Sequence, residues 1–500
     1  MLSAMLRLVF CFFFICTSVS VSGAYGYWLI GSTGSVISYS SAATSGSAAY
    51  AIHVDFNSSN NLISRGYFTN SSGPTFQDSG DYTRLSFSTV TSPGGGSDAI
   101  ILSGRNFAMN DSYVHASAQS AIGISGAPQW ADITRSTMIG QSSGIRPPSN
   151  TTITYSYMKA TDFYAVSLFP SGGAVIRFST MVSVGGGVNS IAIHLLINAG
   201  STIENNYIQG SSGVVMSNSS GLRLASNVIA ATRVGAAAFE ASAGSLEMTV
   251  TSNTIVAPST GRGIYIQDIN AVAMISTNTI SGGQYGISVA TLSAAGKIWI
   301  TSNTIIASVS TTADTFGVYL DGLMTGATIQ NNAVVWRKSA SQAGFTAYGL
   351  YAKSASGLNI DHNRISNPGM ITAGSYEAIR FIDADNSQVK FNDFHSSGTG
   401  LTNAYLFRMT DGSTGGILTN NVFSTSWTVT GSSATILASA DSAGFSDYND
   451  WYSSNTLAMQ YGAVAYQSLA AWQAGLSPQD ANSISAEPQW FNPSVGIEDF

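Results

Sequence analysis

The sequence predicts an all-β protein whose strands coil into a parallel β-helix, a solenoid of about 15 or more rungs. Three observations predict this fold. A six-residue phrase recurs at intervals of 20 to 31 residues, apolar residues hold two fixed places around it, and only 9% of the chain is charged. A fixed phrase at this period is typical of repeat architectures, in which each unit buries its apolar face against its neighbours.

The phrase reads Val-Thr-Ser-Asn-Thr-Ile at 250–255, Ile-Ser-Thr-Asn-Thr-Ile at 275–280 and Ile-Thr-Ser-Asn-Thr-Ile at 300–305. Its asparagine serves as an anchor for aligning the rungs. The residues three before and two after the anchor are apolar in all fifteen rungs aligned in this way. These matched offsets predict one continuous apolar spine inside the solenoid.

Each rung is predicted to contain two or three short strands. The phrase is rich in β-branched residues, alternates with period two and is bounded by Gly, Ser and Asn turns. A second strand recurs upstream of the anchor and begins at Gly263, Gly286, Gly317 and Gly349. Two or three short strands cannot form a closed sheet by themselves. Each strand must therefore pair in parallel with its copies in the rungs above and below.

The anchor asparagines are predicted to be structural. Asparagine tolerates the left-handed backbone of a tight corner, and stacked asparagine side chains can hydrogen-bond up the column. Serine takes the anchor place in N-terminal rungs, for example Ser88 and Ser112, where we expect a weaker ladder. The predicted ladder contains Asn206, Asn227, Asn253, Asn278, Asn303, Asn332, Asn363, Asn392 and Asn421.

Composition excludes one class of partner. A net charge of −7 with only 19 Lys+Arg lacks the basic surface that nucleic-acid binding needs, so no nucleic acid is expected. Low charge also suits a stacked array, because a repeated charge would face its own copy in the next rung. Aromatic residues make up 11% of the chain, too many for a disordered linker.

Residues 1–24 are predicted to be a secretory signal peptide, with Arg7, an apolar stretch over Leu8–Cys16 and a small-residue cleavage zone at 21–24. A retained anchor is the alternative. Both cysteines lie in this segment, so the mature chain would have no disulfide and no cysteine ligand. No later segment is apolar enough for a membrane span, so we expect a secreted or cell-surface protein.

The presence or absence of the repeated phrase divides the rest of the chain into three parts. Residues 25–60 are predicted to form an N-terminal cap or first coil, and residues 61–425 the parallel β-helix. Residues 426–500 lose the phrase and are predicted to be a C-terminal capping segment, with a short helix over 468–475 that has a serine N-cap and a glycine stop. The chain stops at Phe500 without a turn or tail, which leaves truncation open.

Along about 60–425 the Asn-Thr-Ile rungs resemble right-handed parallel β-helix repeat proteins of the pectate-lyase-like superfamily. The ending is similar to the tail of large bacterial secreted or surface β-helix proteins. The resemblance implies a right-handed coil, and enzymes of this kind work with carboxylates, Lys or Arg and sometimes Ca²⁺ on the outside. The tail resemblance is carried by Asp447-Tyr-Asn-Asp-Trp-Tyr452, Leu469-Ala-Ala-Trp472, Asp480-Ala-Asn-Ser-Ile484 and Glu487-Pro-Gln-Trp-Phe-Asn-Pro493.

One charged group is a candidate catalytic site. The stretch Leu358–Arg364 is similar to the Trp-Ile-Asp-His phrase of pectate lyases, with Asn359 where that phrase has tryptophan. One rung on, Lys390 falls above Asp361 and Asp393 above Arg364. A lyase needs a base for the C5 proton and a cation for the resulting anion. The alternative is two opposite-charge ladder pairs worth about 0.2–1 kcal/mol each.

Other catalytic and metal signatures are absent from the sequence. It contains neither the Arg-x-Pro-x-x-Arg phrase of the lyases nor the polygalacturonase set. The five histidines are scattered, so no zinc site and no cofactor is predicted. Asp447, Asn449 and Asp450 could bind Ca²⁺ through oxygens, with ordinary Asx turns as the alternative.

Aromatic side chains that could stack on sugar rings recur at similar offsets after the second-strand glycine. Stacked tyrosines are also ordinary neighbours in a sheet. The candidates are Tyr265, Tyr285, Trp299, Tyr319 and Tyr351.

Two functions follow as hypotheses. The first is a non-catalytic secreted or surface β-helix that serves as a rigid stalk, adhesin or glycan-binding surface. The second is a polysaccharide lyase, or a related carbohydrate-active enzyme, that acts on uronate-containing glycans at Asp361, Lys390, Arg364 and Asp393. The enzyme requires these four groups to face outward in a groove.

Overall fold

A computed structural model gives the protein as an all-β, right-handed parallel solenoid of about 15 turns, with three parallel strands in each turn. The chain forms two compact units, Met1–Arg233 (unit 1) and Val234–Phe500 (unit 2). The structure describes residues 14–15, 19–23, 25–94, 96–118, 122–126, 129–169, 172–242, 244–267, 272–290, 297–308, 313–338, 345–369, 374–399, 401, 403–410, 412–428, 433–434, 437–439, 443–454 and 458–488.

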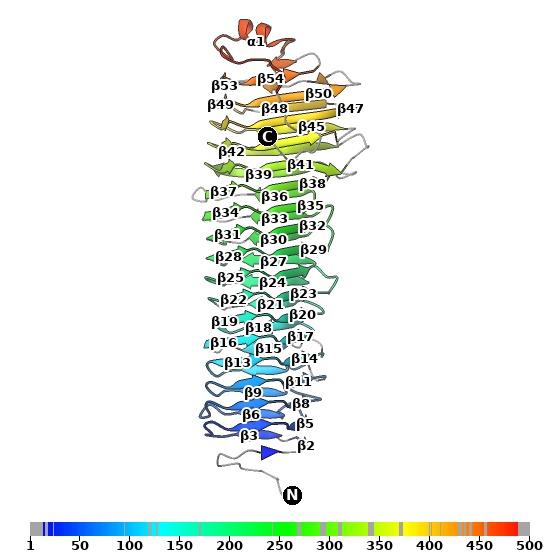
Figure 1. Ribbon diagram of the computed structural model, residues 1–500, viewed down its shortest axis with the longest axis vertical. Coiled ribbons are helices and arrows are strands. Elements are labelled where there is room, and N and C mark those ends of the chain that lie inside the picture. The colour runs from blue at the N-terminus through cyan, green and yellow to red at the C-terminus, as the bar shows by residue number, and fades with distance from the viewer. Residues whose placement is uncertain are drawn as a thin grey trace. The chain divides into compact units, whose positions relative to one another are not determined.

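In unit 1 the strands belong to three sheets, A, B and C, whose neighbours are one rung apart (Figure 1). Sheet A contains β1 (Phe14–Ile15), β4 (Val36–Ser38), β7 (Leu62–Ser64), β10 (Arg84–Ser86), β13 (Phe107–Asn110), β16 (Gln129–Thr134), β19 (Ser149–Thr154), β22 (Val175–Arg177), β25 (Thr202–Glu204) and β28 (Leu222–Ala225). Sheet B contains β2 (Val19–Ser22), β5 (Ser41–Ser45), β8 (Tyr67–Asn70), β11 (Thr89–Ser92), β14 (Tyr113–Ala116), β17 (Thr137–Gly140), β20 (Tyr157–Ala160), β23 (Thr180–Ser183), β26 (Tyr207–Gly210) and β29 (Val228–Ala231). Sheet C contains β3 (Tyr27–Leu29), β6 (Ile52–Val54), β9 (Phe76–Asp78), β12 (Ile100–Leu102), β15 (Ile122–Gly126), β18 (Ser143–Arg146), β21 (Tyr164–Leu168), β24 (Ile191–Leu196) and β27 (Ser212–Ser217).

Unit 2 repeats the arrangement and ends in a helix. Its part of sheet A contains β31 (Met248–Thr251), β34 (Val272–Ser276), β37 (Lys297–Thr301), β40 (Thr328–Gln330), β43 (Asn359–Asp361), β46 (Gln388–Lys390), β49 (Gly416–Thr419) and β53 (Ala443–Asp447). Its part of sheet B contains β32 (Thr254–Ala257), β35 (Thr279–Gly282), β38 (Thr304–Ser308), β41 (Ala333–Lys338), β44 (Arg364–Pro368), β47 (Asp393–Thr399), β50 (Val422–Thr428) and β54 (Asp450–Ser453). Its part of sheet C contains β30 (Ala237–Ser242), β33 (Arg262–Gln267), β36 (Tyr285–Ala290), β39 (Thr315–Thr325), β42 (Thr346–Ser356), β45 (Ser375–Ile382), β48 (Asn403–Thr410), β51 (Ser433–Ala434), β52 (Leu437–Ser439), β55 (Met459–Tyr461) and β56 (Val464–Tyr466), and is followed by α1 (Leu469–Gly475).

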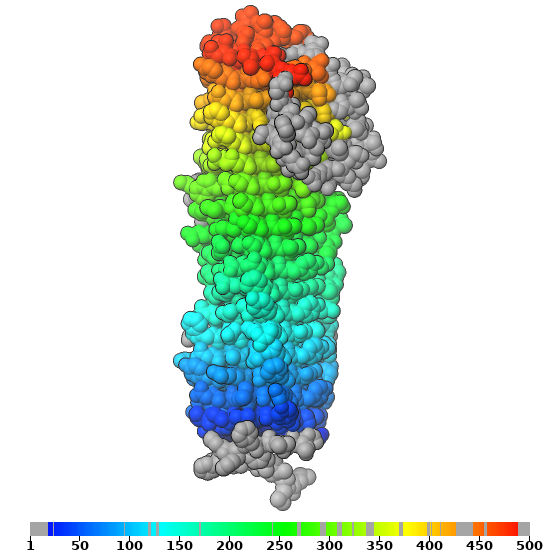
Figure 2. All heavy atoms as spheres, viewed as in Figure 1, coloured from blue at the N-terminus to red at the C-terminus, as the bar shows by residue number. Residues whose placement is uncertain are grey.

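The apolar spine predicted from the matched offsets is confirmed. Ile275, Ile300 and Ile329 pair in register across β34, β37 and β40, and each is at most 1% exposed. Within each unit, surface residues that follow one another along the stack come from successive rungs (Figure 2). Side chains at equivalent positions of successive rungs therefore lie next to one another and form columns on the surface.

The second-strand glycines are required by close approach. A Cβ on Gly286 would lie 2.4 Å from the Ile305 side chain and 2.6 Å from the Gly317 carbonyl oxygen, and Gly263, Gly317 and Gly349 meet the same kind of contact. Gly286 and the following Ile287 are both buried, so two consecutive residues face inward there. This local break in the inward–outward alternation resets which later residues of the strand face solvent.

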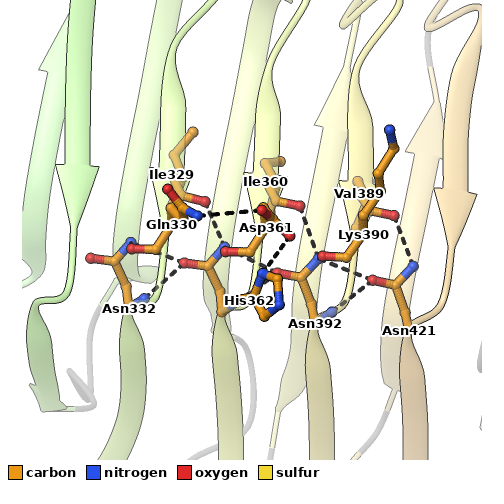
Figure 3. A network of polar contacts seen from close by, with 11 residues as sticks. Ile329, Gln330, Asn332, Ile360, Asp361, His362, Val389, Lys390, Asn392 and Asn421 are labelled. Atoms are coloured by element: carbon orange, nitrogen blue, oxygen red, sulfur yellow. Dashed lines mark hydrogen bonds and ion pairs between the residues drawn. The ribbon is translucent and has the colours of Figure 1, made fainter.

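The anchor asparagines form hydrogen-bonded ladders along the corner between sheets A and B. In unit 2, Asn332 accepts hydrogen bonds from the backbone N–H of Asn303 (3.0 Å) and from its Nδ2 (2.9 Å). Asn332 Nδ2 donates to the carbonyl oxygen of Ile300 (2.7 Å) and to Asn363 Oδ1 (2.9 Å; Figure 3). The ladder of unit 2 contains Asn253, Asn278, Asn303, Asn332, Asn363, Asn392, Asn421 and Asn449.

In unit 1 the same column begins with serine. Ser112 Oγ accepts from the backbone N–H of Ser88 (3.2 Å) and donates to the carbonyl oxygen of Asn110 (2.9 Å). Serine therefore makes one contact with the preceding rung, where an asparagine such as Asn227 accepts two from Asn206. The difference is chemical, because only the amide carries both an acceptor and two donors.

One expectation about the anchors is wrong. The left-handed backbone falls on the residue before each anchor, for example Thr277 (φ 54°), Ser302 (φ 56°) and His362 (φ 52°), and not on the asparagine. The anchor side chain turns inward, where it is nearly fully buried, whereas the residue before it turns outward at the corner. Burial of the amide therefore decides which residue takes the positive φ.

Most of the predicted signal peptide (1–24) lies outside the described residues, and its cleavage stays a prediction. Residues 25–60 contain β3, β4, β5 and β6, which pair in register with the following rung. No described helix is long and apolar enough to cross a bilayer.

The helix expected in the C-terminal segment and its serine N-cap are confirmed: α1 begins after Ser468, whose Oγ accepts the N–H of Ala471 (3.2 Å). The expected glycine stop is wrong, because Gly475 is still helical and Leu476 is the C-cap. Beyond it, the fully buried Asp480 is the centre of a polar cluster. Its carboxylate accepts the indole N–H groups of Trp451 (3.0 Å) and Trp472 (2.9 Å) and the hydroxyl of Ser483 (2.6 Å). Residues 489–500 lie outside the described part of the chain.

A buried carboxyl in unit 1 predicts a pH dependence of stability. Burial raises the pKa of Asp78 to about 7, although Oδ1 accepts hydrogen bonds from the Gly80 N–H (3.0 Å) and the Thr83 hydroxyl (3.0 Å). The folded state then binds the proton more tightly than the unfolded state, so stability falls as pH rises from about 4 to 7. Asp78→Asn should remove this fall and raise the free energy of unfolding at pH 8 by about 1–3 kcal/mol in urea titrations. An Asp78→Asn protein that keeps the wild-type pH profile would contradict this.

Candidate functional site

The four residues of the predicted charged site stack as the rung register requires. Asp361 ends β43 and pairs with Lys390 at the end of β46. Arg364 begins β44 and pairs with Asp393 at the start of β47. All four are half-buried on the outside of adjacent rungs.

The described side-chain contacts of Asp361 are with residues outside the predicted group of four. His362 Nδ1 lies 2.7 Å from Asp361 Oδ1, and Gln330 Nε2 donates to Asp361 Oδ2 at 3.4 Å (Figure 3). The His362 ring stacks on Phe391 with centroids 5.2 Å apart. Figure 3 shows the Lys390 side chain extending away from Asp361, and no ion pair joins these two described residues.

The electrostatics of the second pair are set by burial. Burial raises the pKa of Asp393, and the positive charges of Arg364 and His362 partly offset that rise. Similar cross-rung pairs occur in unit 1, where Arg135 contacts Asp111 at 2.8 Å and Arg177 contacts Glu204 at 2.6 Å. Opposite charges on neighbouring rungs are therefore a recurring element of this surface, independent of any catalytic group.

Four of the five predicted aromatic residues gather on the outer face of sheet C in unit 2. Tyr265 lies on β33, Tyr285 on β36, Tyr319 on β39 and Tyr351 on β42. Trp299 lies on β37 of sheet A and is not part of this group. We call this surface the aromatic strip.

The aromatic strip consists of two columns in register. The first contains Arg262, Tyr285, Phe316, Tyr348, Glu377 and Tyr405. The second contains Tyr265, Ser288, Tyr319, Tyr351, Arg380 and Arg408.

The rings within each column stack face to face. Tyr285 and Phe316 have centroids 4.9 Å apart at 6°, Phe316 and Tyr348 5.0 Å at 7°, and Tyr319 and Tyr351 5.2 Å at 8°. These distances follow from the rung spacing of about 4.8 Å. In the stacked part of the strip each ring covers the face of the next, so it offers ring edges and hydroxyl groups to a ligand. Ser288 separates Tyr265 from Tyr319 in the second column, and the Arg262 guanidinium lies over the Tyr265 ring, 4.3 Å from its centroid.

The charged end of the strip holds one carboxylate between two guanidinium groups. Arg408 Nη1 donates to Glu377 Oε1 at 2.9 Å, and Arg380 Nη1 to Glu377 Oε2 at 3.4 Å. The Glu377 side chain is 4% exposed, that of Arg380 12% and that of Arg408 30%. Burial raises the pKa of Glu377, and the two arginines oppose that rise.

This end has capacity for a further anion. Two guanidinium groups face one carboxylate, and Arg380 Nε is a buried donor without a partner among the described residues. Arg408 also lies over the Tyr405 ring, 4.5 Å from its centroid. An acidic group that reached this place would find an excess positive charge, with Arg408 as the more exposed of the two guanidinium groups.

Sequence reasoning missed Phe316, Glu377, Arg408 and Tyr405 as members of the strip. The usable signal was the register of the second strand, because Glu377 precedes Ala378 as Tyr348 precedes Gly349. The extra inward residue after each glycine shifts the outward positions, which period-two counting does not anticipate.

The three suggested calcium ligands, Asp447, Asn449 and Asp450, make hydrogen bonds with different residues. Asn449 Oδ1 accepts from Asn421 and extends the asparagine ladder by one rung. The Asp447 carboxylate holds the N–H (2.6 Å) and Nδ2 (2.7 Å) of Asn482, which helps keep its pKa low, while Asp450 Oδ1 accepts from Ala486 (3.0 Å). Among the residues that the structure describes, no three His, Cys, Asp or Glu side chains gather to hold a metal ion.

Two family models match the chain. Residues 144–305 match the right-handed β-helix region, and residues 270–467 match the periplasmic copper-binding protein NosD. No curated protein matches the sequence. With the rung geometry, these matches identify the chain as a right-handed parallel β-helix protein, as its resemblance implied.

Similar solved structures share low identity with the chain. The enzymatically active domain of bacteriophage CBA120 tailspike protein 2 is 11% identical, with a TM-score of 0.32, over 58% of this chain and 46% of that one. The A-module of mannuronan C-5 epimerase AlgE6 from Azotobacter vinelandii is 13% identical, with a TM-score of 0.25, over 94% of this chain and 91% of that one. The Streptococcus pneumoniae surface adhesin PfbA is 12% identical, with a TM-score of 0.20, over 75% of this chain and 84% of that one. The chain spans about half the length of the CBA120 tailspike domain and of the Pseudomonas phage phi297 tailspike.

The described residues in the range similar to NosD contain no group of three His, Cys, Asp or Glu side chains that could hold a copper ion. Copper sites use imidazole, thiolate or thioether ligands held together. The two histidines of this range, His362 and His395, belong to no described cluster of potential ligands.

Proposed function

We propose that the protein is a non-catalytic β-helix outside the cytoplasm, a stalk or adhesin that binds an acidic polysaccharide along the aromatic strip of unit 2. The observation that carries the proposal is the strip itself. Hydroxyl-bearing ring edges run in register through several rungs and end at Arg380 and Arg408 beside a single carboxylate. The predicted signal peptide and the match to a family described as periplasmic support the location.

The chemistry of the strip favours binding over turnover. Glycan hydroxyl groups can pair with tyrosine hydroxyls, and an acidic substituent with the forked guanidinium of Arg408. Glu377 is occupied by two arginines, and no second described carboxylate contacts it. The Asp321 carboxylate beside the strip accepts the Tyr319 hydroxyl (2.8 Å). Both of these described carboxylates are therefore hydrogen-bonded, which favours recognition over acid–base chemistry.

Arg408→Ala should weaken binding of polygalacturonate about ten- to a hundredfold, because a charge-assisted hydrogen bond is worth about 1.5–3 kcal/mol. Isothermal titration calorimetry would measure the change. Arg223→Ala, an exposed arginine on sheet A of unit 1, is the matched control and should leave the affinity unchanged. Tyr351→Phe keeps the ring stack but removes a hydroxyl, and should weaken binding less. Equal affinity of wild type and Arg408→Ala would contradict the proposal.

The alternative function is a polysaccharide lyase, which one observation favours. Asp361 with its His362 partner lies in register with Lys390, next to the Arg364–Asp393 pair, on the outside of successive rungs. Incubation with polygalacturonate and alginate, followed by absorbance of unsaturated product, separates the two functions. We expect no product. Turnover that disappears in Lys390→Ala would replace the binding proposal with the enzyme.

A further inference from the structure

A second aromatic column lies on the outer face of sheet B in unit 1 and differs from the aromatic strip. It is formed by the first residue of each strand from β5 to β26. From Tyr67 onward, tyrosine and threonine alternate rung by rung. This tyrosine–threonine column contains Ser41, Tyr67, Thr89, Tyr113, Thr137, Tyr157, Thr180 and Tyr207, all in register.

The alternation leaves a gap beside each tyrosine. With rungs about 4.8 Å apart, successive tyrosines are separated by about 9.6 Å, with a threonine between them. In the aromatic strip the same distance holds a third ring, Phe316, which stacks 4.9 Å from Tyr285 and 5.0 Å from Tyr348. Each gap of the tyrosine–threonine column therefore has the height of a stack from which the middle ring is missing.

Two tyrosine rings of the column contact residues of their own strands. The Tyr207 hydroxyl donates to Gln209 Oε1 at 2.7 Å, and the Tyr113 ring lies 6.1 Å from the His115 ring. Both partners are two residues further along the same strand, so these two side chains extend along their own strands and not across the threonine rungs. Tyr67 is 54% exposed, Tyr113 37% and Tyr207 42%.

One end of the column opens into a hollow with a free cation. The hollow has a volume of about 400 Å³ and is lined by Tyr39, Ser40, Ser41, Arg65, Gly66, Tyr67 and Phe87. The Arg65 guanidinium lies 5.0 Å from the Tyr39 ring centroid and 5.9 Å from that of Phe87. Within the described residues no carboxylate pairs with Arg65, whereas Asp111 and Glu204 are paired with other arginines.

We propose that the tyrosine–threonine column is a second carbohydrate-binding surface, separate from the aromatic strip, in which pyranose rings enter the gaps and an acidic substituent meets Arg65. A sugar ring has an apolar C–H face that stacks on tyrosine and a hydroxyl rim that can pair with Ser41, Thr89 and Thr137. The free charge of Arg65 complements a carboxylate or sulfate on that sugar.

Thr89→Tyr is the decisive variant, because it removes no tyrosine and fills the gap between Tyr67 and Tyr113. The new ring should complete a stack like that of the aromatic strip, so folding should be retained. Binding of hexagalacturonate, measured by calorimetry, should weaken about three- to tenfold. Thr152→Tyr, which makes the same change on an outward position of sheet A, should leave the affinity unchanged. Unaltered binding in Thr89→Tyr would overturn the inference.

Further arms separate the ligand classes and the two surfaces. Tyr113→Ala should weaken both hexagalacturonate and cellohexaose, whereas Arg65→Ala should weaken only the acidic sugar, and the exposed Tyr82→Ala is the control for ring loss. If Arg408→Ala has no effect but Thr89→Tyr does, the proposed function fails and this inference stands. Sedimentation measurements test the competing occupant. A dimer that Thr89→Tyr dissociates, without sugar binding in the wild type, would assign the gaps to a second copy and overturn the inference.

Discussion

Asn332→Ala should lower the free energy of unfolding of unit 2 by about 3–5 kcal/mol, since each buried polar group left without a partner costs about 1–3 kcal/mol. The substitution removes the acceptor for the backbone N–H and Nδ2 of Asn303 and the donor to the carbonyl oxygen of Ile300. All of these contacts are buried. Urea titration followed by circular dichroism, with hydrogen exchange on residues 303 and 363, would measure the loss.

Two variants of unit 2 test the cause. Asn359→Ala removes an exposed asparagine one rung away and should change stability by no more than about 0.5 kcal/mol. Asn332→Ser should lie between wild type and alanine, because the serine ladder of unit 1 keeps one acceptor for the preceding rung. If alanine at position 332 costs no more than alanine at position 359, the ladder has no energetic role.

Asp480→Ala should destabilise the C-terminal segment by about 3–5 kcal/mol, because it leaves two buried indole N–H groups and a hydroxyl without their acceptor. Trp451 and Trp472 are both fully buried around this carboxylate. Their exposure should shift tryptophan fluorescence to longer wavelength. Limited proteolysis should then cut the C-terminal segment before the other rungs of unit 2 unfold.

The matched control is Glu487→Ala, which removes an exposed carboxylate from the same segment. It should leave both fluorescence and proteolysis unchanged. Asp480→Asn should cost about half as much as alanine, since an amide can accept one indole N–H but turns its NH₂ group toward the other donor. Wild-type fluorescence in Asp480→Ala would rule out the carboxylate as the centre of the cluster.

The inferred surfaces depend on how the rungs are filled. In the aromatic strip, successive rings cover one another, so recognition falls to hydroxyl edges and to the arginine pair. In the tyrosine–threonine column, the intervening threonines keep ring faces open. The same rung spacing therefore produces two kinds of surface. Aromatic residues in successive rungs form a stack, whereas aromatic residues in every second rung form a column with gaps.

The residues of the interior were the most predictable part of the protein. Ile275, Ile300 and Ile329 could be aligned by their distance to the anchor because the spine requires an apolar side chain in every rung. The stacking of Asp361 with Lys390 followed from the same alignment, since these residues lie close to the anchor. Contacts farther from the anchor, such as Glu377 with Arg408, escaped because loop lengths vary between the anchor and the second strand.

The sequence by itself determined the axis of stacking and the residues that meet across rungs near the anchor, because a repeated apolar spine permits only one register. Only the tertiary structure decided which residues of sheet C face outward, where the backbone turns left-handed and which hydrogen bonds the carboxylates of the C-terminal segment accept. The physical reason is local packing. Two consecutive inward residues at the second-strand glycine, and the burial of the anchor amide, reorient side chains without altering the repeat that the sequence displays.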